Sequence, residues 1–367
     1  MTQVAGQDDA ALADVVGGLE LPWLGAPLVR AGAGIRCVRG ESGVTVHLEL
    51  GLPLSRRKAE VHERLVSHLR AAGVNDAVSL ELEWAVKAQR VQGRLGPIPG
   101  VSNVVAVSSG KGGVGKSTTT VNLALALAHE GARVGVLDAD IYGPNIPHML
   151  GVAGQHPDSP DGKSITPLQA HGLQTMSIGL LVDAEQPMAW RGPMVTQALN
   201  QLLNQTAWDA LDYLLVDMPP GTGDIQLTLS QRVPVSGAVV VTTPQDIALL
   251  DARKGLQMFR KVNVRVLGIV ENMGTHICSN CGYEEHVFGS GGGERIARQY
   301  DVPLLGTLPL DVRIREEADG GRPTVVADPE GAIARAYREA ALAMAGRLSV
   351  DEDGAGTAFP EIVMEDS

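Results

Sequence analysis

The stretch "GKGGVGKST", Gly110–Thr118, decides the fold of this chain. It matches the pattern G-x-x-x-x-G-K-[ST] and lies between the apolar run "NVVAVSS" and the segment "TTTVNLALALAHEG", whose apolar residues recur at helical spacing. A glycine-rich loop between a strand and a helix can turn its amide groups inward around phosphate oxygens, and the helix N-terminus adds partial positive charge. We therefore predict a phosphate-binding loop.

The side chains of this loop have separate expected tasks. Lys116 reaches the β- and γ-phosphates of ATP, and the Ser117 hydroxyl ligates Mg²⁺. The residues that we expect to surround the phosphates are Gly110, Lys111, Gly112, Gly113, Val114, Gly115, Lys116, Ser117 and Thr118.

The rest of the sequence indicates an α/β protein with two domains. From residue 104 to 349, β-rich runs alternate with helical patterns, which predicts a mostly parallel sheet with helices on both faces. Residues 17–90 alternate like strands around one helical segment, which predicts a second, small α/β domain. We expect a disordered N-terminus over residues 1–16, a linker over 91–103 and an acidic tail over 350–367.

Charge and composition exclude several classes of protein. The formal net charge is −12, which opposes non-specific nucleic-acid binding. The sequence contains no run of about 18 apolar residues, so we predict no membrane-spanning helix. Because the tail is acidic, we also expect no basic amphipathic helix at the C-terminus that could lie on lipid. Three cysteines in 367 residues favour a reducing compartment over a disulfide framework. We expect a cytoplasmic protein with no membrane or nucleic-acid partner.

Three carboxylates end predicted strands. Asp138 and Asp140 end the run "VLDAD" two residues apart and so face the same side, and Asp217 ends "YLLVD". Ligands of parallel α/β sheets bind at the carboxyl ends of the strands, so these carboxylates are candidate nucleotide-site residues. Gly221 and Gly223 follow Asp217, and we expect them to form a flexible switch that senses the γ-phosphate.

The form K-G-G-x-G-K resembles the deviant Walker A group of ATPases, which includes MinD and ParA. The resemblance implies that Lys111 crosses a homodimer interface to touch the partner's nucleotide. It also implies that Asp140 orients the attacking water and that Asp138 and Asp217 support Mg²⁺ through water. Asn272 matches the position that reads adenine in this group.

Four further stretches narrow the resemblance: "DADIYGPNIPHMLG", "WRGPM" (Trp190–Met194), "DMPPGTGD" and "VTTPQDIALLDARKG". They are similar to the Mrp/ApbC family of iron–sulfur cluster carrier ATPases, over about residues 94–348. The resemblance implies an ATP-hydrolysing homodimer that receives a cluster from an upstream assembly scaffold and passes it to apo-proteins.

Cys278 and Cys281, in "HICSNCGYEEH", stand where this family has its Cys-x-x-Cys pair. One chain supplies two thiolates, whereas a two-fold dimer supplies four at its axis, and four cysteines suit a cubane cluster. The resemblance implies a labile [4Fe–4S] cluster bridged between the subunits.

Alternative interpretations stay open. The two thiols with His276 and His286 could hold zinc in one chain, although such short loops fit a tetrahedron poorly, or the four thiols of a dimer could bridge zinc and form an ATPase switch. A MinD- or ParA-like positioning ATPase has no use for the cysteine pair. A redox pair or a nitrogenase-like electron donor would place its cysteines differently.

The N-terminal domain departs from the family pattern. Many members have a Cys-Pro turn here, but this chain reads "LGLPLSRR", with Leu52 before Pro53. Cys37 alternates with Ile35 along a predicted strand, so we expect a buried residue and not a ligand. We expect the domain to dock partners and not to bind a cluster.

Overall fold

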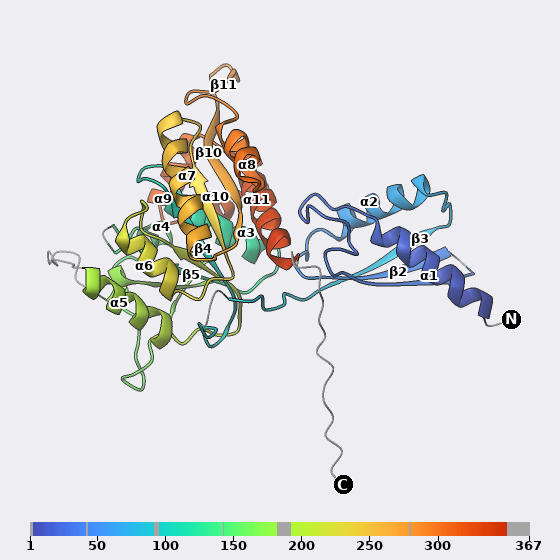
Figure 1. Cartoon of the computed structure of the whole chain (residues 1–367), viewed down its shortest axis with the longest axis horizontal. Helices are drawn as coiled ribbons and strands as arrows, with labels where there is room; N and C mark the ends of the chain where they lie inside the picture. Colours follow the sequence, from blue (N-terminus) through green and yellow to red (C-terminus); the bar gives the residue numbers. More distant parts are fainter. Residues whose placement is uncertain are drawn as a thin grey trace, which may run out of the picture.

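The structure, a computed structural model, describes residues 3–41, 43–91, 95–141, 143–181, 192–278 and 280–350. Its strands form a sheet of nine and a separate sheet of three (Figure 1). The predicted tail from residue 351 onward and the start of "WRGPM", Trp190 and Arg191, lie outside the described residues.

The large sheet is mostly parallel, as the sequence predicted. Its strands run in the order β11-β10-β9-β4-β8-β5-β7-β6, and β12 pairs in parallel with β10. Within the described part of this large sheet, only β10/β11 and β6/β7 are antiparallel pairs. The strands are β4 (Val101–Ser109), β5 (Val134–Asp138), β6 (Leu168–Ala170), β7 (Leu173–Ser177), β8 (Leu211–Asp217), β9 (Gly237–Thr242), β10 (Val266–Ile277), β11 (Glu284–Glu285) and β12 (Leu304–Pro309).

Helices cover both faces of this sheet and bury two hydrophobic cores. Along β4, Val105 and Val107 join the core under α3 and α11, whereas Val104 and Ala106 join the core under α5, α6 and α7. This alternation is the period of two that a strand with both faces buried requires. The helices after β4 are α3 (Lys116–His129), α4 (Ile146–Met149), the 3₁₀ turn η1 (Ile178–Leu180), α5 (Gly192–Gln205), α6 (Asp224–Arg232), α7 (Asp246–Lys261), α8 (Gly292–Tyr300), α9 (Val312–Asp319), α10 (Thr324–Ala327) and α11 (Ala332–Ser349).

The small sheet has the order β1-β2-β3, formed by Gly34–Gly40, Gly43–Leu50 and Val78–Trp84. Helix α2 (Lys58–Ala71) connects β2 to β3, which is why these two strands are parallel. Cys37 is buried on β1, as expected. The division into domains at residues 91–103 stays a prediction.

The expectation of a disordered N-terminus is wrong for most of its length. Residues Gln3–Gly17 form helix α1, and Leu12 and Val16 are buried in the core that also contains the inner face of the small sheet. These two residues are four apart and therefore lie on one side of the helix. Most of the other apolar residues in this stretch are alanines, which mark a buried face only weakly, and the helix packs against β1 and α2.

The small sheet is attached to the large unit through α11 and α3. The core under α3 and α11 continues into the small sheet, and Figure 1 shows α11 on the side of the large sheet that faces β2 and α2. Gly346 of α11 lies against the backbone of Trp23 so closely that a Cβ there would collide with it.

Candidate nucleotide and metal-binding site

The phosphate loop connects β4 to α3 and has the conformation that its glycines allow. Gly113 and Gly115 have φ of 80° and 79°, in the left-handed region, and Gly115 caps the N-terminus of α3. A Cβ on Gly115 would also collide with the side-chain amide of Asn272. The loop therefore presents backbone amides and a helix N-terminus at the carboxyl edge of the sheet, where phosphate groups bind.

Asp217 at the end of β8 is the centre of a buried hydrogen-bond network. Its Oδ2 accepts hydrogen bonds from Lys116 Nζ and Ser117 Oγ, both at 2.6 Å, and its Oδ1 accepts one from Thr120 Oγ1 at 2.7 Å. The structure thus joins the predicted Mg²⁺ residues Ser117 and Asp217 with the predicted phosphate lysine. A carboxylate and a hydroxyl are hard oxygen ligands, so this donor set fits Mg²⁺.

Asp138 and Asp140 lie beside this network. Asp138 is opposite Asp217 in the β5/β8 register and is fully buried, and Ser177 Oγ, Ile146 N–H and Asp140 N–H donate to it. Burial, and next the charge of Asp217, raise the pKa of Asp138 to about 8. Asp140 Oδ2 is 3.7 Å from Lys116 Nζ, so three carboxylates surround one buried lysine.

Lys111 and Gly221 lie at the edge of this cluster. Lys111 is half-buried, and its ammonium group has no hydrogen-bond or ion-pair partner within the described part of the chain. Gly221 has a φ of 104°, and its amide donates to the carbonyl of Ser109 at 2.9 Å, which holds the segment after Asp217 against the end of β4. Roles for Lys111 in a partner's site and for Gly221 in a switch remain predictions.

The structure places Asn272 against the phosphate loop. Its Nδ2 donates to the Val114 carbonyl at 2.9 Å, and its Oδ1 accepts from Met273 N–H at 3.0 Å. Both ends of the amide are therefore committed inside the chain. The contact with adenine stays a prediction, while the structural task of Asn272 is to brace the loop.

Cys278 and Cys281 lie on the hairpin that follows β10. Cys278 N–H donates to the Tyr283 carbonyl, and Gly282 N–H donates to the Cys278 carbonyl, both at 2.9 Å. Cys278 is half-buried and Cys281 is exposed. Hydrogen bonds to the sulfur from the amide of Cys281, and next from that of Asn280, lower the pKa of Cys278, which favours the thiolate that metals bind.

The two flanking histidines hold the hairpin in place. His276 Nδ1 lies 3.0 Å from the Leu310 carbonyl, and His286 Nδ1 lies 2.7 Å from the Gly274 carbonyl. In the described residues, no group of three or more His, Cys, Asp or Glu side chains is arranged to hold a metal ion. The hairpin therefore brings together the two predicted thiols and leaves both histidines bonded to backbone.

One residue of the nucleotide site was missed by sequence reasoning. Thr120 sits one helical turn after Lys116, so its hydroxyl faces the same side as the loop and reaches Asp217. The helical spacing from Lys116 could have indicated Thr120. A threonine inside a helix can also bond only to a preceding carbonyl, however, and Thr120 makes that bond to the Lys116 carbonyl at 2.9 Å.

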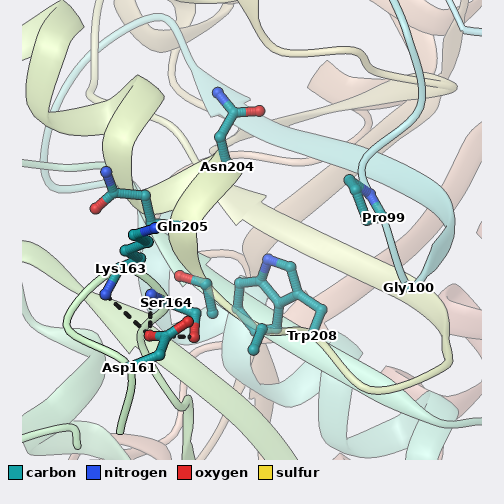
Figure 2. Close-up of a pocket in the computed structure, with 10 residues that line it drawn as sticks. Pro99, Gly100, Asp161, Lys163, Ser164, Asn204, Gln205 and Trp208 are labelled. Atoms are coloured by element: carbon teal, nitrogen blue, oxygen red, sulfur yellow. Dashed lines mark hydrogen bonds between the residues drawn. The ribbon is translucent and has the colours of Figure 1, made fainter. Parts of the chain in front are cut away.

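A separate cavity of about 320 Å³ lies away from this site (Figure 2). Gly100, just before β4, and Trp208, just before β8, line it together with Asn204 and Lys163. It is therefore at the amino ends of the strands, on the opposite edge of the sheet from the phosphate loop. Asp161, at its rim, accepts hydrogen bonds from the backbone and side chain of Ser164 and so closes a local turn.

Comparison with known proteins agrees with this geometry. The model of the ParA family, described as NUBPL iron-transfer P-loop NTPases, matches residues 100–345. The chain belongs to this family of iron-transfer P-loop NTPases. A relative named iron–sulfur cluster carrier protein in Haemophilus influenzae is 53% identical over 88% of this chain and 87% of its own length. Another of that name, in Pseudomonas fragi, is 60% identical over 74% of this chain and 94% of its own length.

A solved structure supports the fold of the large unit. A nucleotide-binding protein from Archaeoglobus fulgidus, in complex with ADP and with cobalt, is 37% identical and has a TM-score of 0.56. The match covers 64% of this chain and 91% of that protein. This solved structure and the family model identify the large unit as a P-loop NTPase fold. Within the described residues, the helices include none with the length and apolarity to cross a membrane.

Proposed function

We propose that this protein is an ATP-hydrolysing carrier that holds a labile iron–sulfur cluster between two copies of the chain and transfers it to apo-proteins. The observation that carries the proposal is the position of the two exposed or half-exposed thiols, on a hairpin at the end of the strand whose Asn272 braces the phosphate loop. The family and the names of the relatives support the cluster as cargo.

The nucleotide chemistry follows from the residues around Lys116. In the structure the Lys116 ammonium group pairs with Asp217 at 2.6 Å and lies 3.7 Å from Asp140. When ATP binds, its phosphate oxygens compete with these carboxylates for the same ammonium group. Ser117 and Asp217 would hold Mg²⁺, which would supply positive charge next to the β- and γ-phosphates. We assign the orientation of the attacking water to Asp140, whose carboxylate lies 3.7 Å from Lys116 Nζ, and a second cation to Lys111 of the partner subunit.

The cluster chemistry follows from the hairpin. Two thiols of one chain fill half of a four-cysteine site, and a second copy supplies the other two across a two-fold axis. A site divided between subunits opens when the interface opens, which suits a carrier. We further propose that the donor is an upstream assembly scaffold, that the acceptors are apo iron–sulfur proteins, and that the protein works in the cytoplasm.

A transfer experiment tests this function. The protein is loaded with iron and sulfide without oxygen, mixed with an apo-ferredoxin, and followed by the acceptor's own spectrum in the presence of an iron chelator. We expect the acceptor to fill despite the chelator, and the protein to hydrolyse MgATP. Iron that reaches the acceptor only through free solution, and is therefore blocked by the chelator, contradicts carriage.

A further inference from the structure

The small sheet together with α1 and α2 is called the small unit below. One of its loops caps the C-terminal end of α3, the helix that begins at the phosphate loop. Ser55 N–H donates to the Glu130 carbonyl at 3.1 Å, and Arg56 Nε donates to the His129 carbonyl at 3.0 Å. The last carbonyls of a helix have no partner within the helix. Here a segment more than seventy residues earlier in the sequence supplies the partners.

Arg57 of the same loop joins α3 to α11. Its Nε donates to Glu130 Oε1 at 3.0 Å, and its Nη1 donates to Glu339 Oε1 at 2.8 Å. The guanidinium lies 5.2 Å from the ring of Trp23, whose Nε1 donates to the other Glu339 oxygen at 2.6 Å. The side chain of Arg57 is 12% exposed and that of Glu130 is 1% exposed, so the pair is shielded from water.

Glu130 depends on this arginine. Burial raises the pKa of Glu130, and the charge of Arg57 opposes that rise. A carboxylate at the C-terminal end of a helix also faces the negative end of the helix dipole, which a cation must offset. Gly131, just after Glu130, lets the loop at Ser55 lie close to the end of α3, because a Cβ at this position would collide with the Ser55 side chain.

The other end of α3 carries the nucleotide site. Lys116 is its first residue, and Ser117 and Thr120 bind Asp217 from its first turns. The helix is about 20 Å long and is buried along most of its length, so it moves as one body. Whatever fixes its C-terminal end therefore sets the position of Lys116 and Ser117.

We propose that Arg57 is a positioning residue for the nucleotide site: by holding Glu130, the small unit sets the place of α3 and thereby the affinity for MgATP. The inference rests on the proposed nucleotide binding. The family model begins at residue 100, so Arg57 lies outside the matched region. The turn that lacks the family's cysteine is thus the start of the loop that docks the small unit onto the ATPase.

Steady-state kinetics of the full chain with Arg57→Ala test this role. We expect the KM for MgATP to rise at least about five-fold, at the low end of typical coupling between sites, while kcat stays within about two-fold. Arg57→Lys should restore part of the loss, because lysine keeps the charge but not the planar fork. Glu130→Gln provides a second variant that keeps the shape of the pair and removes its charge.

The matched control is Arg36→Ala. Arg36 is an exposed arginine of the small sheet whose side chain contacts His47 at 3.4 Å, and neither residue belongs to the contact of Arg57 with Glu130 and Glu339. It should leave KM unchanged. A folded Arg57→Ala protein with wild-type KM, or an equal shift in the control, overturns the proposal.

Coupling between sites is reciprocal, so the wild-type protein offers a second test. MgADP should slow hydrogen exchange of the peptide that contains Ser55, whose amide donates to Glu130. Unchanged exchange under saturating MgADP overturns the inference. Because this readout needs binding and not hydrolysis, a protein that binds nucleotide without hydrolysing it would contradict the proposed function and leave this test intact.

Discussion

The phosphate loop and the cysteine hairpin both lie toward the C-terminal end of β10, the first beside Asn272 and the second just after Ile277, and they differ in completeness. Around the phosphate loop, Lys116, Ser117 and Thr120 all bind Asp217 within one chain. The hairpin presents two thiols, one exposed and one half-buried, with both neighbouring histidines turned to carbonyl groups. Folding of one chain brings the residues of the first site together, whereas in our proposal the second site takes half of its ligands from a second copy of the chain.

The largest expected effect is at the hairpin, where Cys278→Ala or Cys281→Ala should abolish cluster binding. Each variant leaves a dimer with two thiolates for a cluster that needs four. Iron and sulfide analysis after reconstitution without oxygen checks this, and nucleotide affinity should not change. Cys37→Ala, which removes a buried thiol of the small sheet, is the control and should keep the cluster. Loss of the cluster in the control, or its retention in the hairpin variants, would contradict the assignment of Cys278 and Cys281 as the cluster ligands.

The complementary change is Lys116→Ala. It removes the cation that faces the phosphates, so ATP hydrolysis should fall by about 100-fold or more, as with loss of other charge-stabilising groups. Iron loading at the hairpin should persist, because the thiols do not contact Lys116. Phosphate-release kinetics and iron analysis on the same sample separate the two effects. Far-ultraviolet circular dichroism must show a folded variant, since Asp217 loses its buried partner.

The assembled site also predicts a dependence of stability on pH. The pKa of Asp138 is raised to about 8 by burial and by Asp217, so the folded state holds a proton that the unfolded state has released above about pH 4. Its stabilising effect is complete at low pH and is lost as pH rises through about 8. Between pH 6 and 8 the unfolding free energy of the nucleotide-free protein should fall by up to about 1.4 kcal/mol per pH unit.

Urea unfolding at several pH values measures this slope. Asp138→Asn, which cannot titrate, should flatten it. A slope that is the same in both proteins would remove Asp138 from the explanation.

The smallest effect concerns the thiols themselves. Hydrogen bonds from the amides of Cys281 and Asn280 lower the pKa of Cys278, whereas burial, and next the charge of Asp9, raise that of Cys37. In the metal-free protein at pH 7, iodoacetamide should therefore label Cys278 about ten-fold faster than Cys37, because the thiolate is the reactive form. Peptide mass spectrometry measures both rates. Equal rates would mean that the hydrogen bonds of the hairpin do not increase the thiolate fraction of Cys278.

Local sequence indicated that Lys116, Ser117 and Asp217 would lie together, as they do in the structure, but it did not indicate the contacts between more distant segments. The phosphate loop and its flanking strand and helix are encoded within one short stretch, so Lys116 and Ser117 could be placed directly. Asp217 followed from a rule about strand ends. The hydrogen bond of Asn272 to Val114 and the ion pair of Arg57 with Glu130 join residues far apart in sequence, and no local pattern indicates them.

The same reason explains the error at the N-terminus. Helix α1 has two buried core residues, Leu12 and Val16, and most of its other apolar residues are alanines, which distinguish it only weakly from a solvated segment. Its order comes from the sheet and helix on which it packs. The strand β11 was also not predicted, because its pairing with β10 depends on the hairpin between them.

The most direct test of the account is native mass spectrometry of the protein reconstituted without oxygen. We expect the metal-free chain to gain mass only as a dimer, by a single cluster of about four iron and four sulfide ions for two chains. A cluster or a zinc ion bound to a monomer would show that one chain completes the site alone, and would contradict a cargo shared between two copies.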